Sequence, residues 1–182
     1  MERNHLRRVI FVGLMAALVC VSTYIRIVIP TPLGPTMLHL GNIMCILSGL
    51  ILGPGLGFLA AGIGSAIFDL LDPNFAAGFW ITFILKGFYG FIVGWIAHSH
   101  SAFGRNKKKN TAAAIIGAIS YTILYTIKNF ITLHLVLGNP IKAVIPVLFA
   151  KASVSLGNAI IAVICALFIH EALGKRIAIE KM

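Results

Sequence analysis

The sequence predicts an all-α integral membrane protein with six transmembrane helices and both termini in the cytoplasm. Three observations lead to this class: the composition, the lengths of the apolar segments and the placement of the basic residues. Of the 182 residues, 59% are apolar and 11% are charged, whereas soluble domains are about 45–50% apolar and about 25% charged. A soluble enzyme of this length could not bury so much apolar surface. Disorder and a disulfide scaffold are excluded too, because the mean hydropathy is +0.96 and there are three cysteines.

Proline- and glycine-rich breakers divide the chain into six apolar segments, which we expect to form one membrane domain over residues 1–182. A helix needs roughly 20 apolar residues to cross the hydrocarbon region of a bilayer. The segments cover residues 7–29, 38–52, 56–71, 75–97, 111–137 and 141–173, and a very tight turn at 53–55 separates the second from the third. The first could instead be a signal peptide, but its apolar stretch is long and no small-residue cleavage site follows it.

The basic residues predict the orientation of these spans. Ten of the 15 lysines and arginines fall in three clusters: Arg3, Arg7 and Arg8; Arg105 and 107–109; Lys175, Arg176 and Lys181. Six spans place all three clusters on one side of the membrane, and the positive-inside rule makes that side the cytoplasm. The loops 30–37, 72–74 and 138–140 then face outward. The net charge of +10 therefore reports topology, and we expect no nucleic-acid partner.

Three lysines lie where a bilayer disfavours charge. Lys86, Lys128 and Lys151 are each about ten residues from the outer end of their segment, near the membrane centre at 1.5 Å per residue. A charge at that depth costs about 2.5–3.5 kcal/mol on insertion scales. The two acids of the outer half, Asp69 and Asp72, cannot neutralise three lysines. Either a ligand, water or a neutral lysine makes up the difference, and a site open to the outside is the simplest explanation.

Helical periodicity gathers polar and aromatic residues onto single faces of several segments. In the fifth segment the face carries residues 121, 125, 128, 129 and 132, in the sixth 151, 155 and 158, and in the fourth 79, 82, 86 and 89. Apolar walls with a few polar groups are typical of small-molecule pockets. The candidate substrate-binding residues are His39, Asn42, Asp69, Trp80, Lys86, Tyr125, Lys128, Asn129, Lys151 and Asn158.

Several of these residues also have purely structural interpretations. Asp69 and Lys86 could form an ion pair between neighbouring spans, and Tyr121 and Tyr125 could be core aromatics. His39 could either anchor a loop or contact a ligand.

Two further basic residues, Arg26 and Lys142, lie nearer the outer ends of their segments. We expect their side chains to extend to the outer headgroups.

Other features bear on partners and cofactors. Small residues in the first segment, in the registers Gly13-x-x-x-Ala17 and Ala16-x-x-x-Cys20, predict close contact with a partner helix. The chain carries no phosphate-binding loop of ATPases, no nucleophile–base pair and no metal-ligand spacing. We therefore expect no enzyme activity, no cofactor and no metal.

These residues together resemble the substrate-binding (S) component of energy-coupling factor (ECF) vitamin transporters, over nearly the whole chain. The most specific stretches are HLGN at 39–42, LILGPGLG at 50–57, GIGSA at 62–66, Asp69, and TFILKGFYGFIVG at 82–94. Within that family they read most like the hydroxymethylpyrimidine, pyridoxine and pantothenate carriers.

The resemblance implies a high-affinity vitamin site near the outer face of a bacterial plasma membrane, roofed by residues 31–37. It also implies a transmembrane coupling subunit and two cytoplasmic ATPase subunits as partners, with toppling of the S component delivering substrate inside. The family contacts its coupling subunit through A-x-x-x-A on the first span, from which Ala16 and Cys20 depart.

We therefore expect a binding subunit for hydroxymethylpyrimidine or a pyridoxine-like heterocycle, with pantothenate as the alternative because a lysine excess suits a carboxylate. A stand-alone secondary transporter is the alternative from another class. It would need a deep coupling acid, for which Asp69 is the candidate.

Overall fold

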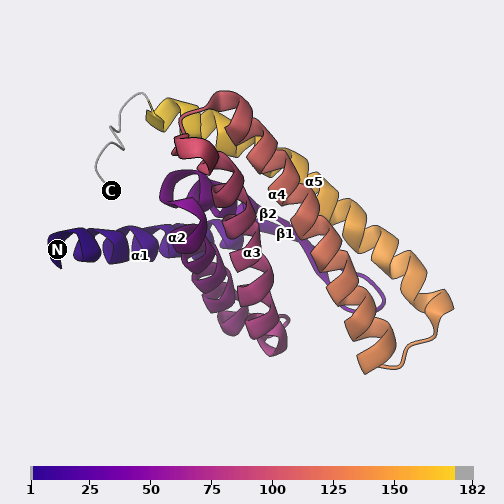
Figure 1. Ribbon diagram of the computed structural model, residues 1–182. Coiled ribbons are helices and arrows are strands. Elements are labelled where there is room, and N and C mark those ends of the chain that lie inside the picture. Colours follow the sequence, from indigo (N-terminus) through magenta and orange to yellow (C-terminus); the bar gives the residue numbers. More distant parts are fainter. Residues whose placement is uncertain (1, 175–182) are drawn as a thin grey trace.

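The protein, described here by a computed structural model over residues 2–174, is a helical bundle with one short β-hairpin (Figure 1). Lys175, Arg176 and Lys181, the third expected basic cluster, lie outside the described residues. The elements in order are α1 (Glu2–Tyr24), β1 (Arg26–Ile29), β2 (Thr36–His39), α2 (Gly41–Leu71), η1 (Ala76–Gly78), α3 (Phe79–Ala97), η2 (Ser99–Ser101), α4 (Lys107–Phe130), η3 (Ile131–Val136) and α5 (Ile141–Gly174).

Five helical segments within the described residues are long and apolar enough to cross a membrane. The second of them, α2, reverses direction at Gly53, whose backbone is non-helical (φ 79°, ψ −174°). Cys45 Sγ lies 3.9 Å from Ser65 Oγ, although 20 residues of straight helix would separate them by about 30 Å. The expected turn at 53–55 is thus confirmed. The half at 41–52 is only about 18 Å long, so six full spans remain a prediction.

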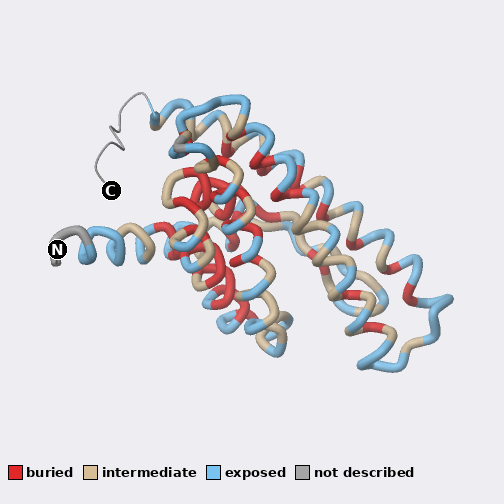
Figure 2. Tube along the Cα trace, in the orientation of Figure 1, coloured by how far each residue is buried: buried red, intermediate tan, exposed pale blue. Residues whose placement is uncertain are grey.

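Glycines let α2 and α3 approach closely. A methyl group on Gly94 would lie 2.5 Å from the carbonyl carbon of Gly53, and one on Gly49 would lie 2.5 Å from the carbonyl oxygen of Gly90. Both distances are far below ordinary van der Waals contact, so neither position has room for a side chain. The buried residues are concentrated in this part of the molecule (Figure 2).

The β-hairpin is the element that sequence reasoning missed. We expected a helix over 7–29, but α1 ends at Tyr24, and Arg26 to Ile29 pair antiparallel with Thr36 to His39. Two of the four β1 residues are isoleucine and one is valine, and β-branched side chains favour strands. The all-α class is therefore correct for the spans and incomplete for the outer loop.

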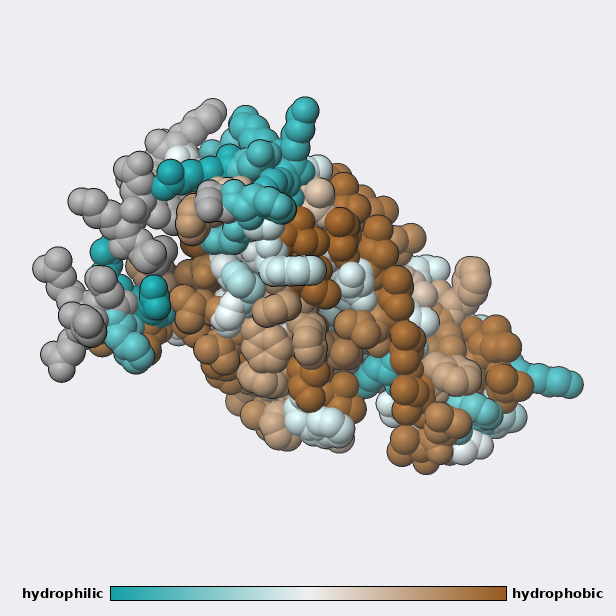
Figure 3. Space-filling model, viewed as in Figure 1, coloured by the Kyte–Doolittle hydropathy of each residue, from teal (hydrophilic) through white to brown (hydrophobic). Residues whose placement is uncertain are grey.

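Each end of the bundle is held together by its own set of contacts. At one end His98 Nε2 lies 2.9 Å from the Leu50 carbonyl oxygen, and Lys107 pairs with Glu171. At the other end the hairpin meets the turn after α2. The loops 30–37 and 72–74 thus lie at one end and the loop after α3 at the other, as expected from the order of the segments. Which end faces the cytoplasm remains a prediction. Hydrophilic side chains gather where α4 begins and α5 ends (Figure 3).

The C-terminal end of α4 continues into a π-helix at Ile131–Val136. The amide of Leu137 donates to the Thr132 carbonyl at 3.0 Å, a bond that spans five residues instead of four. Asn139 closes the segment by donating through Nδ2 to the Leu133 carbonyl at 2.9 Å. π-Helical turns occur frequently at functional sites.

The glycine contacts predict the effect of an added methyl group. We expect Gly94→Ala to lower the free energy of unfolding by about 1–3 kcal/mol, the usual penalty for overpacking, because the new methyl collides with backbone of the α2 turn. Gly55→Ala is the matched control, since no atom lies within 4 Å of its added methyl. Thermal unfolding in detergent measures both, and equal melting temperatures would contradict the close-packing argument.

Candidate functional site

A cavity of about 360 Å³ lies between the hairpin and the helices that face it. Its walls come from the 33–39 segment, from α2, from the first half of α3, from the C-terminal half of α4 with η3, and from the N-terminal part of α5. A hollow bordered by hydrophilic atoms interrupts the apolar surface between α3 and α4 in Figure 3. The volume is within the range of ligand sites, about 300–1,000 Å³.

The structure brings nine of the ten candidate residues to this cavity. They are His39, Asn42, Asp69, Lys86, Tyr125, Lys128, Asn129, Lys151 and Asn158. All of the polar stripe on α4, at 121, 125, 128, 129 and 132, and all of that on α5, at 151, 155 and 158, line the same space.

Trp80 is the exception, because it lies outside the cavity and is 55% exposed. It is two residues from Thr82, which lines the cavity, and two residues of helix are a rotation of about 200°. Trp80 therefore faces away from the site. Phe75 lines the cavity instead. It belongs to the loop before α3, and helical phase gives no information about a loop residue.

Lys86 lies at the base of the site and is 4% exposed. Its Nζ donates to Asn42 Oδ1 and lies 4.2 Å from the ring centroid of Tyr121. Among the described residues no ion pair joins Lys86 to Asp69. The amide oxygen and the tyrosine ring therefore stabilise the buried ammonium group, the ring through a cation–π contact.

Three tyrosines form a stacked wall from the base toward the hairpin. The rings of Tyr89 and Tyr121 stack at 5.1 Å and 12°, and those of Tyr121 and Tyr125 at 6.0 Å and 28°. The Tyr125 hydroxyl meets Thr36 Oγ1 at 3.3 Å. Tyr89 is fully buried behind the wall, whereas Tyr121 and Tyr125 line the cavity. Tyr121 and Tyr125 thus pack against their neighbours and also line the site.

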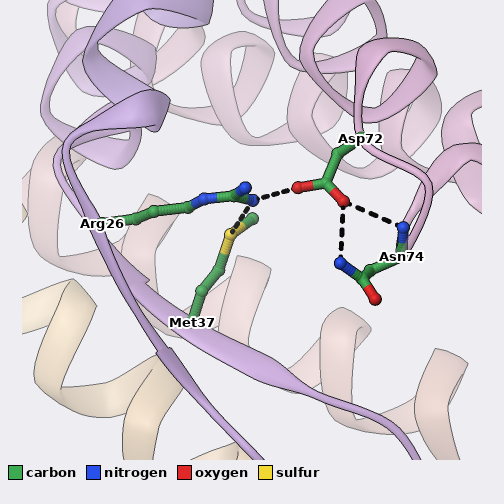
Figure 4. A network of polar contacts seen from close by, with 4 residues as sticks. All are labelled: Arg26, Met37, Asp72 and Asn74. Atoms are coloured by element: carbon green, nitrogen blue, oxygen red, sulfur yellow. Dashed lines mark hydrogen bonds and ion pairs between the residues drawn. The ribbon is translucent and has the colours of Figure 1, made fainter.

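The hairpin and its connecting loop, residues 26–39, form the roof of the cavity. This roof is fastened to the turn after α2 by the network in Figure 4. Arg26 forms an ion pair with Asp72 and approaches Met37 Sδ at 3.7 Å, while Asp72 Oδ1 accepts from the backbone and side-chain amides of Asn74 at 2.9 and 3.1 Å. The expectation that Arg26 extends to the headgroups is therefore wrong, because its guanidinium group turns inward to a carboxylate. Burial alone would raise the pKa of Asp72, but the bonds from Asn74 and Arg26 lower it below its ordinary value.

Two α5 residues hold the other side of the roof. Lys151 Nζ donates to the Pro35 carbonyl at 3.3 Å. Asn158 donates through Nδ2 to the Met37 carbonyl at 2.9 Å, and its Oδ1 accepts from the His39 amide at 2.9 Å. Both functional groups of the Asn158 side chain are thus bonded to β2. It lines the cavity mainly as a support for the hairpin.

His39 faces the cavity as a neutral imidazole. Its Nδ1 accepts from the Gly41 amide at 3.1 Å, so in the neutral ring the proton lies on Nε2. Burial, and after it the charges of Lys86 and Arg26, lower the pKa of His39 well below its ordinary value. The Nε2–H group is then a donor at physiological pH.

The expected docking residues of α1 divide between two environments. Gly13 and Ala17 are exposed, and Cys20 is partly buried. Ala16 is 5% exposed, and its carbonyl oxygen packs directly on Gly64 of α2. Ala16 is therefore an internal contact of the bundle, because its surface is already covered. The Gly13–Ala17 register is the one that remains open.

A bundle of membrane-spanning helices around a roofed, polar cavity defines a membrane protein with a site of small-molecule size. The family model described as "ECF-type riboflavin transporter, S component" matches residues 3–175. The chain therefore belongs to this family of transporter components.

The fold agrees with this membership. A solved structure described as "Structure and mechanism of the S component of a bacterial ECF transporter" matches with a TM-score of 0.67 and 21% identity, over 94% of this chain and 97% of that chain. An uncharacterized protein of Pyrococcus woesei is 33% identical over 94 residues, 51% of this chain and 62% of that protein. A UPF0397 protein of Streptococcus sanguinis is 37% identical over 94 residues, 52% of this chain and 50% of that protein. The aligned region thus spans about half to three-fifths of these two relatives.

The protonation state of His39 can be measured directly. We expect ¹⁵N NMR to show a neutral ring with the proton on Nε2 at pH 6, because folding withdraws this group from water and places it near two cations. Since the folded pKa is depressed, the folded state loses stability relative to the unfolded state only as the pH falls below the ordinary value near 6.5. The His39→Gln variant assigns the signal. A ring that protonates with a midpoint at or above 6.5 would contradict this environment.

Proposed function

We propose that this chain is the high-affinity substrate-binding subunit of an ATP-driven ECF importer in a bacterial plasma membrane. We propose further that its cavity binds a small hydroxylated heterocycle such as hydroxymethylpyrimidine or pyridoxine. Membership of the S-component family supports the first part. The observation that carries the second is the tyrosine wall, which offers flat aromatic surface beside the polar base at Lys86 and Asn42.

The cavity suits a planar ring with polar edges. Tyr125 and Phe75 line it with aromatic surface on which a ring can stack. The neutral His39 donates from Nε2, and Asn129, whose Nδ2 is bonded to the Tyr125 carbonyl at 2.8 Å, presents its amide oxygen as an acceptor. A hydroxylated heterocycle can use both kinds of partner at its rim.

The size of the cavity bears on the alternatives. A volume of about 360 Å³ lies near the lower end of the usual range for ligand sites. This favours a single ring over the tricyclic riboflavin that appears in the family's description. Pantothenate has a carboxylate for the lysines and no ring for the tyrosine wall, which makes it the second choice.

Calorimetry on the detergent-purified protein tests the substrate class. We expect hydroxymethylpyrimidine or pyridoxine to bind more tightly than riboflavin or pantothenate. Lys86→Met should weaken binding by about ten- to a hundredfold. The substitution removes the charged donor at the base of the site, where a hydrogen bond to a charged group contributes about 1.5–3 kcal/mol, and it leaves Asn42 Oδ1 without its donor. Lys142→Met, at an exposed position outside the cavity, is the control. Failure of all four compounds to bind would overturn the proposed function.

Co-purification tests the proposed partners, a transmembrane coupling subunit and two ATPase subunits. We expect Ala17→Leu to reduce their recovery with the tagged protein by severalfold, because the added side chain covers the exposed Gly13–Ala17 surface that lets a partner helix approach. Ala112→Leu, an equal change at an exposed position of α4, should leave recovery unchanged. A wild-type protein that purifies alone while still transporting substrate would identify a stand-alone carrier instead.

A further inference from the structure

The charges around the cavity do not balance. The charged residues that line it within the described chain are Lys86, Lys128, Lys151 and Asp69, an excess of two positive charges. His39 adds none, because it is neutral. Charges taken out of water without partners are costly, so this excess of positive charge favours an anionic ligand.

The three lysines differ in what satisfies them. Lys86 is held by Asn42 and by the ring of Tyr121. Lys151, which is 6% exposed, has a carbonyl oxygen of the roof as its recorded hydrogen-bond partner, and an ammonium group has three donors. Lys128 makes no hydrogen bond within the described residues, and the opposite charge that acts on it is the carboxylate of Asp69.

The positive charge of Lys128 acts unfavourably on Lys151 across two helices whose Thr122 and Ser155 hydroxyls lie 3.1 Å apart. Both line the cavity from the neighbouring helices α4 and α5, and Lys151 reaches the roof at Pro35. Two ammonium groups with spare donors on adjacent walls form a site where an anion can accept hydrogen bonds from both lysines. Charge-assisted bonds of this kind are roughly twice as strong as neutral ones.

We propose that the substrate of this cavity carries a carboxylate or phosphate group, and that this group binds between Lys128 and Lys151 beneath the roof while the ring lies on the aromatic wall. The inference rests on the proposed function, and within its class of small hydroxylated heterocycles it favours members that carry an acidic group over pyridoxine and hydroxymethylpyrimidine themselves. An anion there brings the two lysines a shared partner and removes their mutual repulsion. Because the two lysines repel each other, the ligand-free protein should have a lower free energy of unfolding than a variant that lacks one of the two charges.

Matched ligands test the inference by calorimetry. Pyridoxine is compared with 4-pyridoxate, in which a carboxylate replaces one hydroxymethyl group, and with pyridoxine 5′-phosphate. We expect at least one anion to bind the wild-type protein about tenfold or more tightly than pyridoxine does. Lys128→Gln and Lys151→Gln should each reduce that preference to about threefold or less, and Lys142→Gln should retain it. The carboxylate and the phosphate arms identify which acid the site prefers.

Thermal unfolding of the ligand-free protein gives a second readout. Lys128→Gln should raise the melting temperature by removing repulsion, whereas Lys142→Gln should not change it. Pyridoxine that binds as tightly as both anions would overturn the inference and leave the proposed function standing. If neither pyridoxine, its anions nor hydroxymethylpyrimidine binds, the proposed function fails and the inference fails with it.

Discussion

The cavity depends on one constraint: a non-helical backbone near the membrane must have its polar groups bonded by protein. Open strand edges are not tolerated against lipid, so the β1–β2 hairpin exists here only because side chains complete its bonding. Asn158 supplies an acceptor for the His39 amide and a donor for the Met37 carbonyl, as a neighbouring strand would. Without that amide the β2 edge would lose both of these bonds, and the Lys151–Pro35 bond alone would hold the roof to α5.

Charged side chains in this region likewise combine a structural role with a role in the site. Three cations at the hairpin end of the bundle, Arg26, Lys86 and Lys151, are each directed at a particular oxygen or ring, and these contacts also join elements that are distant in sequence. Arg26 links the hairpin to the turn after α2, Lys86 links the two sides of the cavity base, and Lys151 links α5 to the roof. The groups that stabilise the roof are therefore the groups that set the electrostatic character of the site. Ligand recognition and folding stability are coupled in this region.

Sequence reasoning located the helical part of the site because helical phase is a local property. The period of 3.6 residues placed the polar faces of α4 and α5 toward a common space, and the tight turn at 53–55 followed from glycine and proline chemistry. The same rule, applied strictly, would have excluded Trp80. What could not be predicted was non-local. The partner of Arg26 is 46 residues away, and the four-residue strand β1 sits inside an apolar run that reads as a continuing helix.

The π-helix that follows α4 has a consequence for divergence within the family. A turn closed by a bond over five residues holds one residue more than an α-helical turn, so deleting one residue from Ile131–Val136 would restore regular geometry. Everything before the deletion, including Tyr121 and Tyr125 of the tyrosine wall, would keep its orientation. The residues after it would rotate by about 100°, replacing the side chains that border the mouth. Insertion or deletion of a residue here would thus let related proteins change which molecules enter the cavity without changing its base.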